Sequence, residues 1–89
     1  MKNETSVQKI LSDYQLTRRE SEIALLVTKG LTNKEIANQL FIVEGSVKFH
    51  LTNIYEKMRV NNRRHLIMNV LEIMEFWLWN VQKIKEKKH

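Results

Sequence analysis

The chain has 89 residues, a net charge of +5, no cysteine, no proline and only two glycines. This length suffices for one small domain, and the missing cysteine excludes disulfides, thiolate metal sites and cysteine nucleophiles. The scarcity of turn residues predicts an all-α protein. We expect a cytoplasmic location, since the amino terminus resembles no secretion signal and polar residues interrupt the apolar segment 66–81.

Positive charge is concentrated in residues 43–65, which hold five basic residues against two acidic ones. Such a cluster suits a polyanionic partner. A second cluster lies in residues 83–89, with four lysines against one glutamate. This tail is more typical of a solvated helix end, where lysines complement the helix dipole.

Capping patterns mark the starts of two helices. Residues 4–14 have the apolar spacing of a short first element. Thr17 and Glu20 form a T-x-x-E capping box for the next helix, and Gly30 is placed to end it in a left-handed conformation. Thr32 and Glu35 repeat the capping box and predict a helix over residues 33–40.

Residues 41–43 allow a three-residue turn before a third helix over residues 44–58. Two helices so joined form a helix-turn-helix if they cross closely. The small Ala37 permits such a crossing and can face Val47 on the next helix. An ordinary helical hairpin in a bundle is the alternative.

The third helix has an unusual outward residue. Its apolar residues at helical spacing form one buried stripe: Val47, Leu51, Ile54 and Met58. Phe49 lies about 200° from Val47 and therefore points away from that stripe, beside Lys48 and Thr52. An aromatic ring facing water on a small protein indicates a contact surface.

The fourth helix is predicted to run from about Asn62 to the end without a breaker. Its apolar stripe is longer than a compact four-helix domain can cover, which indicates self-association. The predicted dimer contacts on this stripe are Val70, Met74, Trp77 and Val81. Folding of this helix onto residues 7–14 of the same chain is the alternative, and both contacts can occur together.

Four segments together resemble one family. The segments are LTRRESEI, GLTNKEIA, EGSVKFHL and KMRVNNR. In this order and over about residues 16–71, they resemble the LuxR/NarL/GerE-type helix-turn-helix of bacterial transcription regulators.

The resemblance implies a four-helix DNA-binding domain that acts as a dimer. Its third helix is expected in the major groove and its fourth at the dimer contact. We expect this domain over residues 16–75, an amino-terminal extension over 1–15, and an extended dimerisation helix with a basic tail over 76–89. Larger members carry a receiver or ligand-binding domain, for which 89 residues leave no room.

The resemblance also assigns contacts to DNA. Lys48, Phe49 and Thr52 match base-contacting positions; lysine suits guanine, and a phenyl ring suits the thymine methyl group. The phosphate-side positions are Asn33, Lys34, Ser46, Lys57 and Arg63. Alternatively, Phe49 packs against a neighbouring helix or a dimer partner.

The sequence departs from the family pattern at three places. Val43 occupies a position where serine usually caps the third helix, so this helix begins without a side-chain cap. Arg59 replaces a favoured glycine, so we expect the following turn to avoid a positive φ. Arg64 and His65 replace the usual Thr-Glu and add charge.

The leading hypothesis is a sequence-specific, dimeric transcription regulator, not an enzyme. We expect double-stranded DNA and a second copy as partners, with RNA polymerase or another regulator as further candidates, and no cofactor or metal. The alternatives are an interaction protein that sequesters a related regulator through the fourth helix, an interfacial membrane helix, and a sigma-like factor. Membrane binding is the weakest of these.

Overall fold

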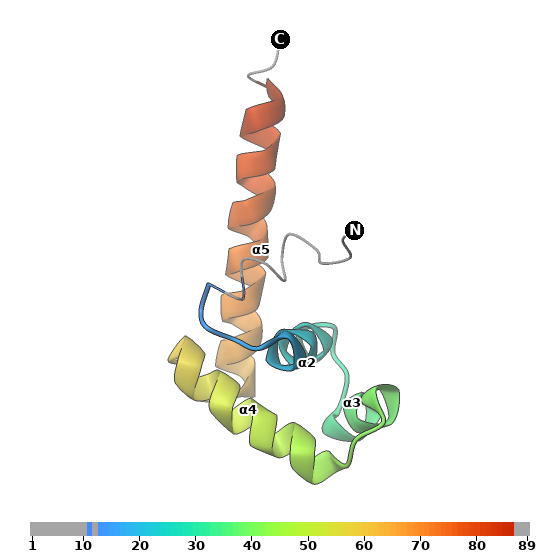
Figure 1. Ribbon diagram of the computed structural model, residues 1–89. Coiled ribbons are helices and arrows are strands. Elements are labelled where there is room, and N and C mark those ends of the chain that lie inside the picture. Colours follow the sequence, from blue (N-terminus) through green and yellow to red (C-terminus); the bar gives the residue numbers. More distant parts are fainter. Residues whose placement is uncertain (1–10, 12, 87–89) are drawn as a thin grey trace.

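The computed structural model describes residue 11 and residues 13–86, with side chains up to residue 84. This part of the chain is helical and contains no strand: α2 (Arg18–Thr28), α3 (Asn33–Leu40), α4 (Glu44–Met58) and α5 (Arg63–Glu86) (Figure 1). The all-α prediction is confirmed, and so are the predicted bounds of the helices over residues 33–40 and 44–58. The element predicted over residues 4–14 lies mostly outside the described residues.

Helix α2 is the centre of the packing. It contacts α3, α4 and α5, while α3 and α4 also pack on each other. Its Ile23, Ala24 and Val27 are fully buried, together with side chains from the other three helices. In Figure 1, α5 extends well beyond the other helices, so its distal part has no described helix beside it.

Both predicted capping boxes are present. The Thr17 hydroxyl accepts from the Glu20 N–H at 3.1 Å, and the Glu20 carboxylate accepts from the Thr17 N–H at 2.9 Å. The matching distances for Thr32 and Glu35 are 3.1 and 2.8 Å. Gly30 has φ +95°, as its predicted place after α2 requires. These local bonds explain why α2 and α3 begin where the sequence indicates.

The turn after α4 differs from our expectation. Arg59 adopts φ +58°, so the prediction that this turn avoids a positive φ is wrong. The conformation lets the Arg59 N–H donate to the Glu56 carbonyl at 3.3 Å and the Val60 N–H donate to the Tyr55 carbonyl at 2.9 Å. Val60 is thereby buried in the core. Burial of this side chain and the two bonds offset the left-handed strain.

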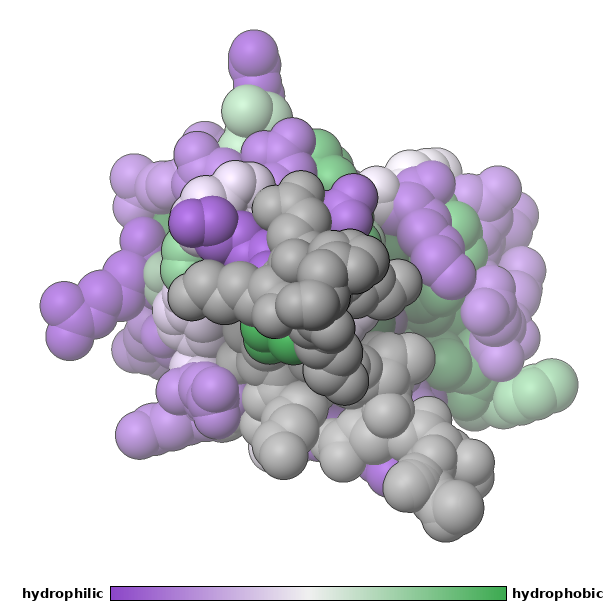
Figure 2. All heavy atoms as spheres, turned by 90° about the horizontal axis from the view of Figure 1, so that it is seen from above, coloured by the Kyte–Doolittle hydropathy of each residue, from purple (hydrophilic) through white to green (hydrophobic). Residues whose placement is uncertain are grey.

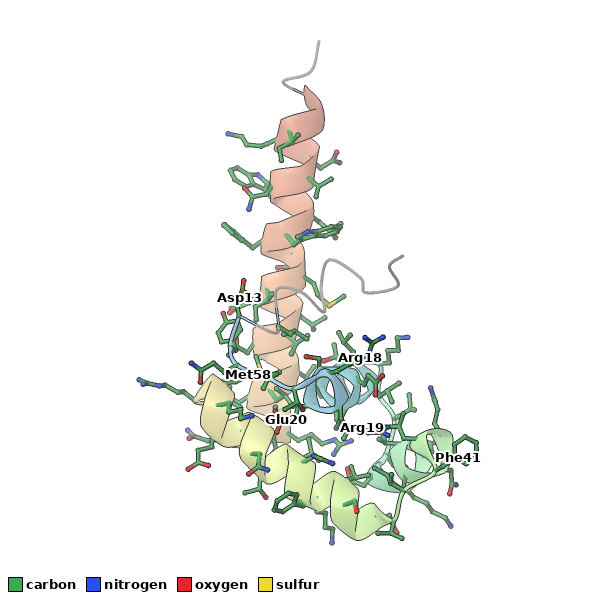
Figure 3. All side chains as sticks on the ribbon, in the orientation of Figure 1. Asp13, Arg18, Arg19, Glu20, Phe41 and Met58 are labelled. Carbon is green, nitrogen blue, oxygen red and sulfur yellow. The ribbon has the colours of Figure 1, made fainter. Side chains whose placement is uncertain are left out.

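A second non-glycine residue with positive φ lies in the turn between α3 and α4. Phe41 has φ +60° and is 93% exposed. Its side chain points away from the helices in Figure 3. Val43 then starts α4 without a side-chain cap, as predicted.

A buried carboxylate joins α2 to α4. The Lys57 ammonium donates to Glu20 Oε1 at 2.8 Å, and the Glu20 side chain is only 5% exposed. Burial by itself raises the pKa of Glu20. Hydrogen bonds from Lys57 and Thr17, with the charge of Lys57, outweigh burial and hold the pKa below its ordinary value of 4.5. The carboxylate is therefore ionised at neutral pH.

We predict that Arg59→Gly raises the free energy of unfolding by about 1 kcal/mol, because glycine adopts a positive φ without strain. Urea denaturation measures this change. Arg59→Ala is the control, since it removes the same charge and keeps the strained Cβ. If alanine stabilises as much as glycine, the gain comes from the charge and the strain argument fails.

We predict that Lys57→Met lowers the free energy of unfolding at pH 7 by about 1–3 kcal/mol, because it leaves a buried carboxylate without its cation. In the wild type, the unfolded chain binds a proton at Glu20 more readily than the folded chain. The stability from Glu20 is thus complete above pH 4.5 and is lost as the pH falls through the lowered pKa. In Lys57→Met this loss is smaller.

Urea unfolding between pH 3 and 7 tests this prediction. Glu22→Gln is the control: it removes the more exposed Arg19–Glu22 pair, at 3.5 Å, and costs less than about 1 kcal/mol. Equal stability and pH dependence of Lys57→Met and the wild type would contradict the prediction.

Candidate nucleic-acid interface

Helix α4 packs through one face. The predicted stripe of Val47, Leu51, Ile54 and Met58 is buried, with exposed fractions of 0–5%. These side chains join the core that α2 and α3 share with α4. The stripe prediction is confirmed, and it fixes which residues of α4 face outward.

The outward face of α4 carries the three predicted base-contacting residues. Lys48 and Thr52 are exposed, and Phe49 is 65% exposed. The Phe49 ring meets His50 edge-on with centroids 5.9 Å apart. Phe49 therefore does not pack inside the protomer, and the alternative of a neighbouring helix in the same chain is wrong.

Thr52 has a restricted hydrogen-bonding capacity. Its hydroxyl donates to the Lys48 carbonyl at 3.1 Å. The donor is used within the helix, and the lone pairs of the oxygen remain available as acceptors. In this conformation the Thr52 oxygen can accept a hydrogen bond from a ligand, whereas the Lys48 ammonium can only donate one.

Three of the predicted phosphate-side residues lie at helix starts. Asn33 and Lys34 are the first two residues of α3, and Lys34 is exposed. Ser46 is the third residue of α4 and is partly buried. Helix starts carry unpaired N–H groups and a partial positive charge, so both ends favour an anion.

The other two predicted phosphate-side residues bond to protein groups. The Lys57 ammonium is paired with Glu20. The Arg63 guanidinium donates to Asn33 Oδ1 at 2.7 Å and to the Leu31 carbonyl at 2.6 Å. Both cations join segments more than 25 residues apart, which local spacing does not reveal.

One predicted dimer contact is wrong. Val70 is 0% exposed and lies in the core of its own chain, so it cannot reach a partner. Met74 packs against that core and is partly buried. Trp77 and Val81 are also partly buried. The stripe centred on Val70 therefore packs within its own chain, because α5 contacts α2 and Val70 belongs to the core that the two helices share.

Our sequence analysis missed two leucines beside that stripe. Leu71 is 42% exposed and Leu78 is 55% exposed. The spacing of Ile67, Leu71, Met74, Leu78 and Val81 alternates between four and three. Such a heptad-like pattern is the signal that finds these leucines, because it is typical of helices that pair along one side.

The two histidines among the described residues, His50 and His65, lie next to protein groups of their own chain. His65 Nδ1 accepts from the Asn61 N–H at 3.2 Å, and the His65 N–H donates to Asn62 Oδ1 at 2.8 Å. These bonds cap the start of α5. His50 Nδ1 is buried and has no hydrogen-bond partner among the described residues.

Where described residues are visible from above, the surface is largely hydrophilic, and the larger hydrophobic area lies toward the right of the view (Figure 2). Within the described residues, none of the helices combines the length and apolar character that crossing a bilayer requires.

Comparison with known proteins identifies related chains. The model of the family of bacterial regulatory proteins named luxR matches residues 14–70. The transcriptional regulatory protein LiaR of Bacillus subtilis is 47% identical over 58 residues, which are 65% of this chain and 28% of LiaR. The uncharacterized response regulatory protein YgeK of Escherichia coli is 47% identical over 62 residues, 70% of this chain and 42% of YgeK.

A third relative is the transcriptional activator protein CarR of Pectobacterium carotovorum, which is 44% identical over 61 residues, 68% of this chain and 25% of CarR. The match to this chain thus spans less than half the length of each of these three relatives. The family match covers α2, α3, α4 and the start of α5, which hold the exposed face and both helix starts described above. The chain therefore belongs to the luxR family of bacterial regulatory proteins.

Proposed function

We propose that the chain is a sequence-specific, dimeric DNA-binding transcription regulator that inserts α4 into the major groove. One observation carries this proposal: α4 buries its aliphatic stripe and holds Lys48, Phe49 and Thr52 outward on its opposite side. The family and the relatives named as transcriptional regulators support it. Because this chain matches only part of each relative, the proposal does not extend to activities of the rest of those proteins.

The three outward side chains supply different kinds of base contact. Lys48 donates to guanine O6 or N7, and Phe49 contacts the thymine methyl group. The Thr52 oxygen accepts from the amino group of adenine or cytosine, since its own proton is used within the helix. A DNA site that presents both guanine and thymine to the centre of α4 would match these three side chains.

The starts of α3 and α4 position the domain on the phosphates. Lys34 adds charge, and Asn33 and Ser46 add polar groups beside the free amides. Phosphate contact by Lys57 and Arg63 stays a prediction, since both already bond to protein groups. Lys57 is also neutralised by Glu20, which reduces its attraction for DNA.

A second copy of the chain is the proposed partner of α5. Leu71 and Leu78, with Met74 and Val81 beside them, form one side that we name the α5 seam. The α5 seam lies next to the stripe that packs on α2, so both contacts form together. Paired helices with this spacing bury leucines that are otherwise in water.

The exposed distal part of α5 also favours a second candidate function. Phe76, Leu78, Trp79 and Ile84 are all more than half exposed. A related regulator that binds there would be held in a mixed dimer. Such an antagonist shifts no DNA by itself, whereas the proposed regulator shifts its selected site alone.

We predict that Lys48→Ala weakens binding to DNA selected from a random pool by about ten- to a hundredfold and relaxes the preference at one base pair. Binding is measured by band shift and by fluorescence anisotropy on the selected site and on single-base variants. Lys34→Ala is the control. It should weaken binding to all DNA sequences alike, and it should reduce the slope of log affinity against log salt concentration by about 0.9. Unchanged affinity and preference in Lys48→Ala would remove Lys48 from the base contacts.

We predict that Leu71→Gln together with Leu78→Gln weakens dimerisation by about a hundredfold or more, because the dimer buries these leucines twice. Sedimentation equilibrium measures the dissociation constant. Phe76→Gln removes a similarly exposed apolar side chain from another side of α5 and should leave the dimer intact. A leucine variant that sediments like the wild type would exclude the α5 seam.

A further inference from the structure

The start of α5 is tied to the start of α3 by one guanidinium. Arg63 donates through Nη1 to Asn33 Oδ1 at 2.7 Å and through Nη2 to the Leu31 carbonyl at 2.6 Å. Helix α3 otherwise packs on α2 and α4. The two bonds thus connect the phosphate-side end of α3 to the long helix.

The chemistry of this contact fixes the orientation of the Asn33 amide. A guanidinium has only donors, so the amide atom that faces it must be the oxygen. The amide nitrogen then points away from Arg63. Its two N–H groups are left for another acceptor, at a helix start that already favours an anion.

Both acceptors of Arg63 are neutral. No carboxylate compensates its charge in these bonds, in contrast to Lys57, which is paired with Glu20. The positive charge therefore remains at the start of α3, while Nη1 and Nη2 of the guanidinium each donate to a protein group.

We propose that Arg63 is a positioning residue for DNA binding: it holds the Asn33 amide so that Nδ2 donates to a backbone phosphate. This inference rests on the proposed DNA-binding function. It differs from a direct phosphate contact by Arg63, because the fork of two bonds is needed as well as the charge. Lysine keeps the charge but cannot reproduce the fork.

The test measures DNA affinity and melting temperature of Asn33→Ala, Arg63→Lys, their double variant and Asn33→Asp. The first two should each weaken binding about five- to tenfold, and the double variant should be no more than about twofold weaker than Asn33→Ala. Asn33→Asp keeps an acceptor for Arg63 and suits the helix start, so its melting temperature should equal or exceed that of the wild type. It has no N–H donors, so its DNA affinity should fall more than tenfold.

Each contrary outcome overturns a separate statement. Additive effects of Asn33→Ala and Arg63→Lys, or full affinity in Arg63→Lys, would overturn the positioning role and leave DNA binding in place. Full affinity in Asn33→Asp would show that the contact serves the fold alone. A wild-type chain that binds no selected DNA would instead overturn the proposed function, and the inference with it.

Discussion

The burial of one face of α4 is the constraint on which the candidate interface depends. Val47, Leu51, Ile54 and Met58 span three turns and are at most 5% exposed. Each such side chain contributes about 1.5–3 kcal/mol when it leaves water. A rotation of α4 that turned Phe49 inward would expose several of them together. The apolar stripe therefore also sets the direction of Lys48 and Thr52, although neither residue takes part in the core.

The net charge of residues 43–65 does not measure the charge available to DNA. Lys57 is paired with the buried Glu20, whereas the charge of Arg63 is held by two neutral acceptors. One cation thus contributes mainly to packing of α2 on α4, and the other keeps its field at the start of α3. Because phosphate binding depends on uncompensated charge, the partners of each cation matter more than the count.

Local chemistry explains which features the sequence predicted. The capping boxes and the bounds of α3 and α4 depend on residues within one or two turns, so the spacing was sufficient. The positive φ of Arg59 depends on burial of Val60 in a core made by other helices. The partners of Lys57 and Arg63 lie 37 and 30 residues away. Such pairs follow from the tertiary fold and not from local pattern.

Val70 shows why helix periodicity alone did not distinguish the face of α5 that packs on α2 from the face proposed to form the dimer. Side chains within 60° of Val70 include both the face that α2 covers and the margin of the α5 seam, because Leu71 and Leu78 lie only about 80–100° away. Helix α2 contacts α4 as well as α5. In a dimer built on the α5 seam, the path from one α4 to the other runs through α5 and α2 of each copy. The packing of α2 would then set the spacing of the two recognition helices, and with it the half-site spacing on DNA.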